Sequence, residues 1–157
     1  MRPSPPRKGG DRIGPTRRGN GSKVMLVTDG KGTPLGLHVD SASPGETTLL
    51  ETVLDDVRVP RTRLPRLIAD RGYDSDPLRR VLRRRGTQLI APHRISRTRS
   101  APQDGRPLRR YRRRWIVERT FAWLHRFRRL VVRYEYYAVM FLAFLHVACL
   151  IIALRRL

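Results

Sequence analysis

Residues 66–92, RLIADRGYDSDPLRRVLRRRGTQLIAP, predict a strand, a helix and a second strand in succession. The stretch begins with a short apolar run that stops at Asp70, and it ends with another apolar run. Between them, Asp76 can act as helix N-cap, Pro77 suits a first helical position that needs no backbone donor, and Gly86 can end the helix. Strands alternating with a helix indicate an α/β domain.

Upstream of this unit, the sequence predicts a hairpin and a helix. Two apolar runs within residues 23–41 flank Asp29-Gly30, a dipeptide typical of hairpins because type I′ turns need positive φ. Residues 46–57 place apolar side chains at helical spacing. Residues 1–22 are rich in Gly, Pro and Arg, and we expect them to form an irregular basic arm.

Downstream, residues 93–107 form a basic polar loop, and two long helices are predicted at about 108–131 and 136–156. The whole order, ββαβαβαα, indicates one α/β domain with a central mixed sheet over residues 23–157. Residues 136–154 carry no formal charge, and this uncharged segment is just long enough to span a membrane. His146 within them and the absence of a second span favour a buried C-terminal core helix and no membrane association.

The charge of the chain predicts a polyanionic partner. Its formal net charge is +21, and of its 34 basic residues only Lys8, Lys23 and Lys31 are lysines. A field of this sign favours nucleic acid first and an anionic membrane surface second, with affinity that falls as salt rises. Cys149 is the only cysteine, so an intrachain disulfide is excluded, and without a secretory signal the cytoplasm is the expected compartment.

One acidic residue, Glu118, stands among the arginines of residues 111–130, YRRRWIVERTFAWLHRFRRL. On a continuous helix it would share a stripe with basic and aromatic side chains, away from the apolar face. That stripe contains Tyr111, Arg114, Glu118, Ala122, His125 and Arg129. One interpretation is an exposed ion pair with Arg114, contributing only ~0.2–0.5 kcal/mol. The other is that Glu118 holds a cation.

Asp70 is the second candidate, because ligands of open α/β sheets bind beyond the carboxyl ends of the strands. Its carboxylate is suited to a hard cation such as Mg²⁺. Asp29, Asp74 and Asp76 are explained by turns and caps. Two carboxylates on different elements of a basic α/β domain suggest phosphodiester chemistry with one or two Mg²⁺ ions.

Residues 70–86, DRGYDSDPLRRVLRRRG, and 111–135, YRRRWIVERTFAWLHRFRRLVVRYE, closely resemble insertion-sequence transposases of the DDE class, IS-five type. The resemblance implies an RNase H-like core and Mg²⁺ (or Mn²⁺) held by two aspartates and a glutamate. It further implies cleavage and strand transfer at insertion-sequence ends and in target DNA. Asp70 matches the second aspartate of the family and Glu118 its glutamate, so both are expected as catalytic metal ligands.

The family pattern is Tyr, two residues, Arg, three residues, Glu, six residues, Lys. The resemblance, together with the basic arm, assigns DNA contacts to Tyr111, Arg114, His125, Arg129, Lys8, Arg17, Arg18 and Lys23. His125 stands where the family usually has lysine and is a shorter and only partly charged substitute for it. A homodimer associated with the bacterial nucleoid is the expected assembly.

The first family aspartate has no match. In the family it lies on the strand before a KGG-type loop, and that loop falls here at Lys8-Gly9-Gly10. The first strand and the helical DNA-binding region before it are therefore expected upstream of Met1, so the chain is expected to be the C-terminal part of a transposase. It would then be either a second reading frame normally fused to the upstream part by frameshifting, or a decayed or mis-started copy. Alone, the chain is expected to bind DNA but to cleave it poorly or not at all. The rival interpretation is a non-enzymatic basic nucleic-acid-binding protein, which explains the charge but not the placement of Asp70 and Glu118.

Overall fold

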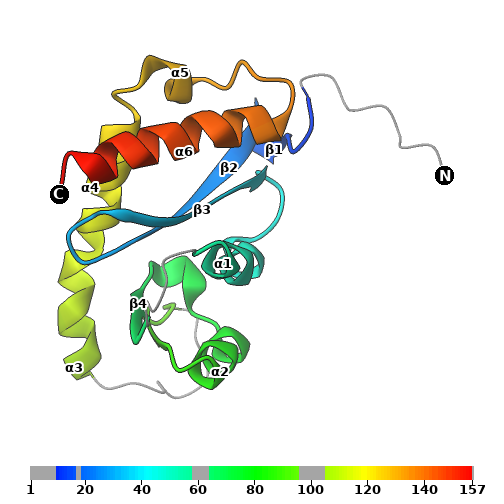
Figure 1. The fold of residues 1–157 in the computed structure, drawn as a ribbon. Coiled ribbons are helices and arrows are strands. Elements are labelled where there is room, and N and C mark those ends of the chain that lie inside the picture. Colours follow the sequence, from blue (N-terminus) through cyan, green and yellow to red (C-terminus); the bar gives the residue numbers. More distant parts are fainter. Residues whose placement is uncertain (1–9, 17–18, 58–63, 96–104, 157) are drawn as a thin grey trace.

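The computed structural model describes residues 10–16, 19–57, 64–95 and 105–156 (Figure 1). Strands and helices are mixed along the chain, as the α/β prediction requires. The described strands form two small sheets, one antiparallel and one parallel.

The predicted hairpin is confirmed. Strands β2 (Gly19–Thr28) and β3 (Pro34–Ser41) pair antiparallel, and β1 (Gly14–Thr16) pairs with the first residues of β2. The expectation of an irregular arm up to residue 22 is therefore wrong for β1 and the start of β2. These strands form through backbone pairing of glycine-rich and polar residues, and such residues give no apolar alternation to detect.

The turn of the hairpin differs from the expected two-residue type I′ turn. The Asp29 side chain organises a longer loop, because its Oδ1 accepts hydrogen bonds from the backbone N–H groups of Lys31 and Thr33, both at 2.8 Å. The residue with positive φ is Gly32, at 88°, and not Gly30. Asp29 is thus a turn residue, as predicted, but by way of its side chain.

The strand–helix–strand unit is also confirmed. Strands β4 (Arg66–Ile68) and β5 (Gln88–Ile90) pair in parallel, and α2 (Asp76–Arg84) connects them. The N-cap of α2 is Ser75, whose side chain accepts from the Leu78 N–H, so the assignment of Asp76 as cap is wrong by one residue.

Gly86 ends α2 as predicted, with φ at 75°. Its N–H donates to the Arg83 carbonyl, and the Thr87 N–H donates to the Leu82 carbonyl, which is the hydrogen-bond pattern of a Schellman motif. The short connection to β5 follows directly from this helix end.

The prediction of one central mixed sheet is wrong for the described residues. The β1–β2–β3 sheet and the β4–β5 sheet remain separate. Helix α1 (Glu46–Asp55) joins them through an apolar cluster that includes side chains of β2, α2 and β5. The sequence showed apolar runs in β2, β3, β4 and β5, but apolar runs alone cannot show which strands are neighbours.

The predicted long helix at 108–131 is broken into four pieces. These are α3 (Gly105–Leu108), the 3₁₀ segment η2 (Arg109–Arg114), α4 (Trp115–Leu124) and α5 (Arg128–Val131). Every residue of η2 except Tyr111 is arginine. Like charges three and four residues apart destabilise an α-helix, a penalty that a count of apolar spacing does not include.

The C-terminal helix α6 (Ala138–Leu154) is a core helix on one face, as predicted. Its Phe141, Leu145 and Ile152 are buried in a cluster with Leu37 of β3. Figure 1 shows α6 and α1 on opposite sides of the β2–β3 hairpin, and each side has its own apolar cluster. Within the described ranges, no helix has both the length and the apolar character needed to cross a membrane.

Candidate functional site

A cavity of about 430 Å³ lies between the two sheets and brings together the two acids singled out from the sequence. Asp70 reaches it from the end of β4, and Glu118 reaches it from the first turn of α4. The two residues are separated by almost fifty positions in sequence but line one cavity. The wall also contains Arg113 and Arg114, so acids and bases meet at the same place.

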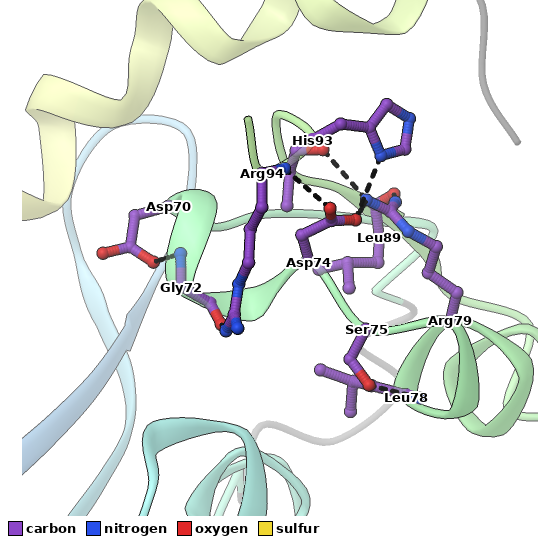
Figure 2. Close-up of polar contacts among 10 residues, drawn as sticks. Asp70, Gly72, Asp74, Ser75, Leu78, Arg79, Leu89, His93 and Arg94 are labelled. Carbon is purple, nitrogen blue, oxygen red and sulfur yellow. Dashed lines mark hydrogen bonds and ion pairs between the residues drawn. The ribbon is translucent and has the colours of Figure 1, made fainter. Parts of the chain in front are cut away.

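Asp70 caps a short 3₁₀ turn, η1 (Arg71–Tyr73), that directly follows β4. One carboxylate oxygen, Oδ1, accepts from the Gly72 N–H at 2.8 Å. Figure 2 shows the other carboxylate oxygen directed away from this turn. A Cβ at position 72 would come within 2.9 Å of Asp70 Oδ1, so glycine allows this close approach. The turn therefore fixes one oxygen of Asp70 and leaves the other directed outward, where a cation could be held.

Glu118 forms the ion pair that helix spacing predicted, with Arg114 Nη2 at 2.7 Å from Glu118 Oε1. The side chains of Arg114 and Glu118 are 41% and 55% exposed, respectively. The Arg114 guanidinium also lies 5.7 Å from the centre of the Tyr111 ring. An exposed pair of this kind contributes only about 0.3–0.5 kcal/mol, so Glu118 could exchange Arg114 for a metal ion at small cost. Both interpretations of Glu118 are compatible with this geometry.

Two further carboxylates, Asp29 and Glu46, line the cavity. Burial raises the pKa of Asp29, but hydrogen bonds from the backbone of Thr33 and Lys31 outweigh it and leave that pKa below its ordinary value. Asp29 is thus ionised and committed to its own turn. Across the described part of the chain, no three His, Cys, Asp or Glu side chains are grouped to hold a metal ion.

Glu46 is the lining residue that the sequence did not single out. It is the first residue of α1, and its carboxylate lies near Gly72 and close enough to the Tyr73 hydroxyl to affect its pKa. Burial first, and then the negative charges of Glu46 and Asp70, raise the pKa of the Tyr73 hydroxyl above its ordinary value. Acidic residues are common in the first turn of a helix because they interact favourably with the positive end of the helix dipole. The position of Glu46 in the sequence therefore did not indicate that it lies close to Gly72 and Tyr73.

Asp74 follows the turn η1, as expected of a turn residue, but its side chain is buried in a polar network (Figure 2). Its Oδ1 accepts from Arg79 Nη2 at 2.9 Å and lies 3.0 Å from His93 Nδ1. Its Oδ2 accepts from the Arg94 N–H at 2.8 Å. The side chain is only 2% exposed. Asp74 therefore ties the loop after β4 to the loop after β5.

This network also supports the turn that carries Asp70. Burial raises the pKa of Asp74, but hydrogen bonds from the Arg94 backbone, Arg79 and His93 outweigh it and hold that pKa well below its ordinary value. Arg94 Nη2 in turn donates to the Gly72 carbonyl at 2.6 Å. Asp74 and Arg94 thus position the turn whose N–H holds Asp70.

The single basic stripe predicted along residues 111–129 is wrong, because the helix is broken. Tyr111 lies in η2, His125 is the C-cap of α4, and Arg129 lies in α5. Arg129 Nε donates to Glu135 Oε1 at 2.8 Å, so this arginine is already paired with a carboxylate. The DNA-contact role of these residues stays a prediction.

The remaining predicted DNA contacts lie in or near the N-terminal region. Lys23 lines the cavity, and its Nζ donates to the Pro44 carbonyl at 2.8 Å. Lys8, Arg17 and Arg18 lie outside the described residues.

Comparison with known proteins shows the family of the chain. Residues 4–153 match the family model described as "Transposase DDE domain". The chain is 40% identical to the "Putative transposase for insertion sequence element IS402" of Burkholderia cepacia, over 90% of this chain and 69% of that protein. It is 29% identical to the "Putative transposase for insertion sequence element IS6501" of Brucella ovis, over 85% of this chain and 98% of that protein.

No solved structure matches the chain. The family model nevertheless spans nearly all of the sequence, including both segments that carry Asp70 and Glu118. The chain belongs to the transposase DDE domain family.

Proposed function

We propose that this protein acts in DNA transposition, by Mg²⁺- or Mn²⁺-dependent cleavage and strand transfer at the ends of an insertion sequence of the IS-five type. The observation that carries the proposal is that Asp70 and Glu118, on separate elements, line one cavity together with Arg113 and Arg114. An RNase H-like core is part of the same proposal, supported by the family and by the α/β order of elements.

The chain's own residues would have distinct tasks in this reaction. Asp70 and Glu118 would hold the divalent ion, with the capping bond from Gly72 N–H fixing how Asp70 presents its outward oxygen. A divalent ion at such a site activates water or a 3′-hydroxyl and stabilises the leaving oxygen. Arg114, released from Glu118 when the ion binds, would be available for a DNA phosphate.

The basic segment η2 supplies the DNA contact beside the site. Arg109, Arg110, Arg112 and Arg113 are all exposed, and Arg113 lines the cavity itself. Arginines that neutralise phosphates give affinity without sequence preference, and that affinity falls steeply with salt. The backbone of a bound duplex would therefore be held within reach of Asp70 and Glu118.

A third carboxylate ligand is expected from outside the described residues, on an N-terminal part or a fused upstream frame. This proposal is supported by the absence, among the described side chains, of any metal-binding group of three. It follows that the chain alone should bind DNA and cleave it poorly. The test is a nicking assay on a labelled supercoiled plasmid with Mg²⁺. Robust nicking by the purified chain, lost on Asp70→Ala, would overturn the need for a third ligand.

The alternative function is non-enzymatic binding of nucleic acid, which the charge of the chain favours. A titration with Mn²⁺, followed by electron paramagnetic resonance, separates the two functions. A transposase site should lose Mn²⁺ affinity on Asp70→Asn but keep it on Asp55→Asn, a matched change on the exposed face of α1. Equal Mn²⁺ binding by both variants would favour the non-enzymatic function.

A further inference from the structure

A second cavity, of about 400 Å³, lies where the C-terminal ends of α4 and α6 meet. Its volume falls within the range of small-molecule sites, about 300–1,000 Å³. Figure 1 shows the end of α6 beside α4. The cavity is lined by Trp123, Arg126, Phe127, Ile152, Arg155 and Arg156. It shares no lining residue with the cavity that contains Asp70 and Glu118, so it is a separate feature of the molecule.

Two aromatic rings are available in this second cavity. Trp123 and Phe127 are half-buried, because each packs against the α6 core cluster and each also lines the cavity. The centre of the Trp123 ring lies 4.8 Å from the Arg119 guanidinium and 5.0 Å from that of Arg156. An exposed cation–π contact is weaker than the stacking of a base on an aromatic ring. A flat aromatic ligand could therefore take the place of Arg156 on Trp123.

The second cavity is also strongly basic. Arg126, Arg155 and Arg156 are exposed, and none of them pairs with a carboxylate among the side chains that the structure describes. The C-terminal ends of α4 and α6 carry partial negative charges, about half an elementary charge each, which the three arginines outweigh. Helix dipoles explain why basic residues stand at these ends, but they do not explain the open aromatic rings between them. Rings and arginines together indicate an anionic ligand with a flat aromatic group.

We propose that this second cavity binds a nucleotide of a DNA strand whose base is unpaired. The base would stack on the Trp123 ring, and Arg126 and Arg155 would hold the neighbouring phosphates. In a duplex the bases stack on one another and present only their edges in the grooves, so a paired nucleotide cannot cover the ring. The cavity is therefore suited to single-stranded DNA, whereas the arginines of η2 are suited to a duplex backbone.

This inference rests on the proposed action on DNA and adds a contact for one strand of it. Glu118 and Trp123 both lie on α4 and are five residues apart, which corresponds to about 7.5 Å along the helix axis. Successive phosphates of a strand are spaced by about 3.4 Å along a duplex. A strand that passes Glu118 could therefore place an unpaired nucleotide in the second cavity only a few nucleotides away.

The test measures binding of the full chain to a fluorescein-labelled strand of five thymidines by fluorescence anisotropy. The control strand has the same length and the same phosphates, but every nucleotide is abasic. We expect the thymidine strand to bind about tenfold more tightly or better, because each stacked base adds to the affinity. Equal affinities would mean that the chain contacts phosphates only and would overturn the proposal. Free thymidine monophosphate competing as well as the strand would overturn the assignment to a DNA strand.

Tryptophan fluorescence locates the bound base. The chain has two tryptophans, so Trp115→Phe leaves Trp123 as the only reporter, and Trp123→Phe leaves Trp115. We expect the thymidine strand to quench the fluorescence of Trp123, and a duplex of the same sequence to leave it nearly unchanged. Quenching of Trp115 without quenching of Trp123, or equal quenching of Trp123 by strand and duplex, would overturn the proposal.

A pair of matched substitutions tests the phosphate contact. Arg126→Gln removes a positive charge from the second cavity, whereas Arg84→Gln removes one from the last turn of α2. At about 150 mM salt, where exposed charges more than about 8 Å apart are largely screened, we expect only the first change to weaken binding of the thymidine strand, by about tenfold.

Equal weakening by the two substitutions would overturn the proposal, because it would show attraction to overall charge alone. Both arginines are exposed, so both variants should fold, and the comparison of thymidine and abasic strands needs no variant. Neither a metal ion nor DNA cleavage enters these measurements. Failure of this inference is therefore distinguishable from failure of the transposition proposal.

Discussion

Replacing Asp74 with asparagine removes one negative charge from a buried network while keeping the shape of the side chain. Asp74 and its partner Arg79 are 2% and 9% exposed. Arg79 also donates to the carbonyls of Leu89 and Ala91, at 3.1 and 3.0 Å. These bonds hold its guanidinium in place, so it stays buried when the charge of Asp74 is removed. The change therefore removes the charge of Asp74 from beside a buried guanidinium.

The expected cost follows from that burial. Breaking a buried ion pair by removing one partner costs about 3–5 kcal/mol, and asparagine should fall near the lower end because it can still accept one hydrogen bond. For a chain of this length, each kcal/mol lowers the melting temperature by about 2–4 °C. We therefore expect Asp74→Asn to lower the melting temperature by roughly 6–12 °C near neutral pH.

The assay is thermal unfolding by circular dichroism, with Asp55→Asn as the matched control. Asp55 pairs with Arg85 at 2.8 Å, but these side chains are 65% and 40% exposed. Such a pair contributes at most about 1 kcal/mol, so the control should change the melting temperature by no more than a few degrees. Equal shifts for the two variants would refute the buried-network argument.

The difference in melting temperature between wild type and Asp74→Asn should also depend on pH, which gives a second check of the buried network. Because folding lowers the pKa of Asp74, its charge stabilises the fold fully above the unfolded pKa, about 3.9, and progressively less as pH falls towards the folded pKa. The difference in melting temperature between wild type and Asp74→Asn should be constant from about pH 5 to 8 and should become smaller below about pH 4. A difference that widens in acid would contradict the assignment.

Three further predictions follow from other contacts. Arg94→Ala should weaken Mn²⁺ binding while leaving DNA affinity nearly unchanged, because Arg94 braces the Gly72 carbonyl of the turn that carries Asp70; a loss of DNA affinity alone in a gel-shift assay would contradict this. Thr120→Val should lower the free energy of unfolding in urea by about 1–3 kcal/mol, because the fully buried Thr120 hydroxyl donates to the Gly32 carbonyl at 2.9 Å; no change would contradict it. DNA affinity should fall by about 10³-fold or more between 50 and 200 mM salt if six or more phosphates are contacted, as fluorescence anisotropy can measure; a flat salt profile would contradict it.

The sequence predicted those parts of the fold that depend on local patterns. The hairpin of β2 and β3 and the β4–α2–β5 unit rest on apolar runs and on Gly or Pro at a turn, whereas α6 rests on its long uncharged apolar run alone. The break of the arginine-rich helix was missed because apolar spacing continued across it while repulsion between arginines did not enter the pattern. The division of the strands into two separate sheets was missed because it depends on which strands become neighbours.

The residues of the candidate site can likewise be separated into those that local sequence patterns indicate and those that depend on contacts between distant segments. Asp70 and Glu118 could be singled out from sequence because one ends an apolar strand and the other is an isolated acid among arginines. Glu46 and the burial of Asp74 could not, because both depend on contacts between segments far apart in the chain. Asp74 contacts His93, which lies nineteen residues further along the chain, and no local sequence pattern indicates this contact.

The most direct test of the site is Mn²⁺ binding to the full chain bound to duplex DNA, followed by electron paramagnetic resonance. We expect Asp70→Asn and Glu118→Gln each to lower Mn²⁺ affinity about tenfold or more, while DNA affinity persists. The matched exposed change Asp55→Asn should leave both affinities intact. Mn²⁺ affinity unchanged in both site variants would contradict a shared metal site at Asp70 and Glu118.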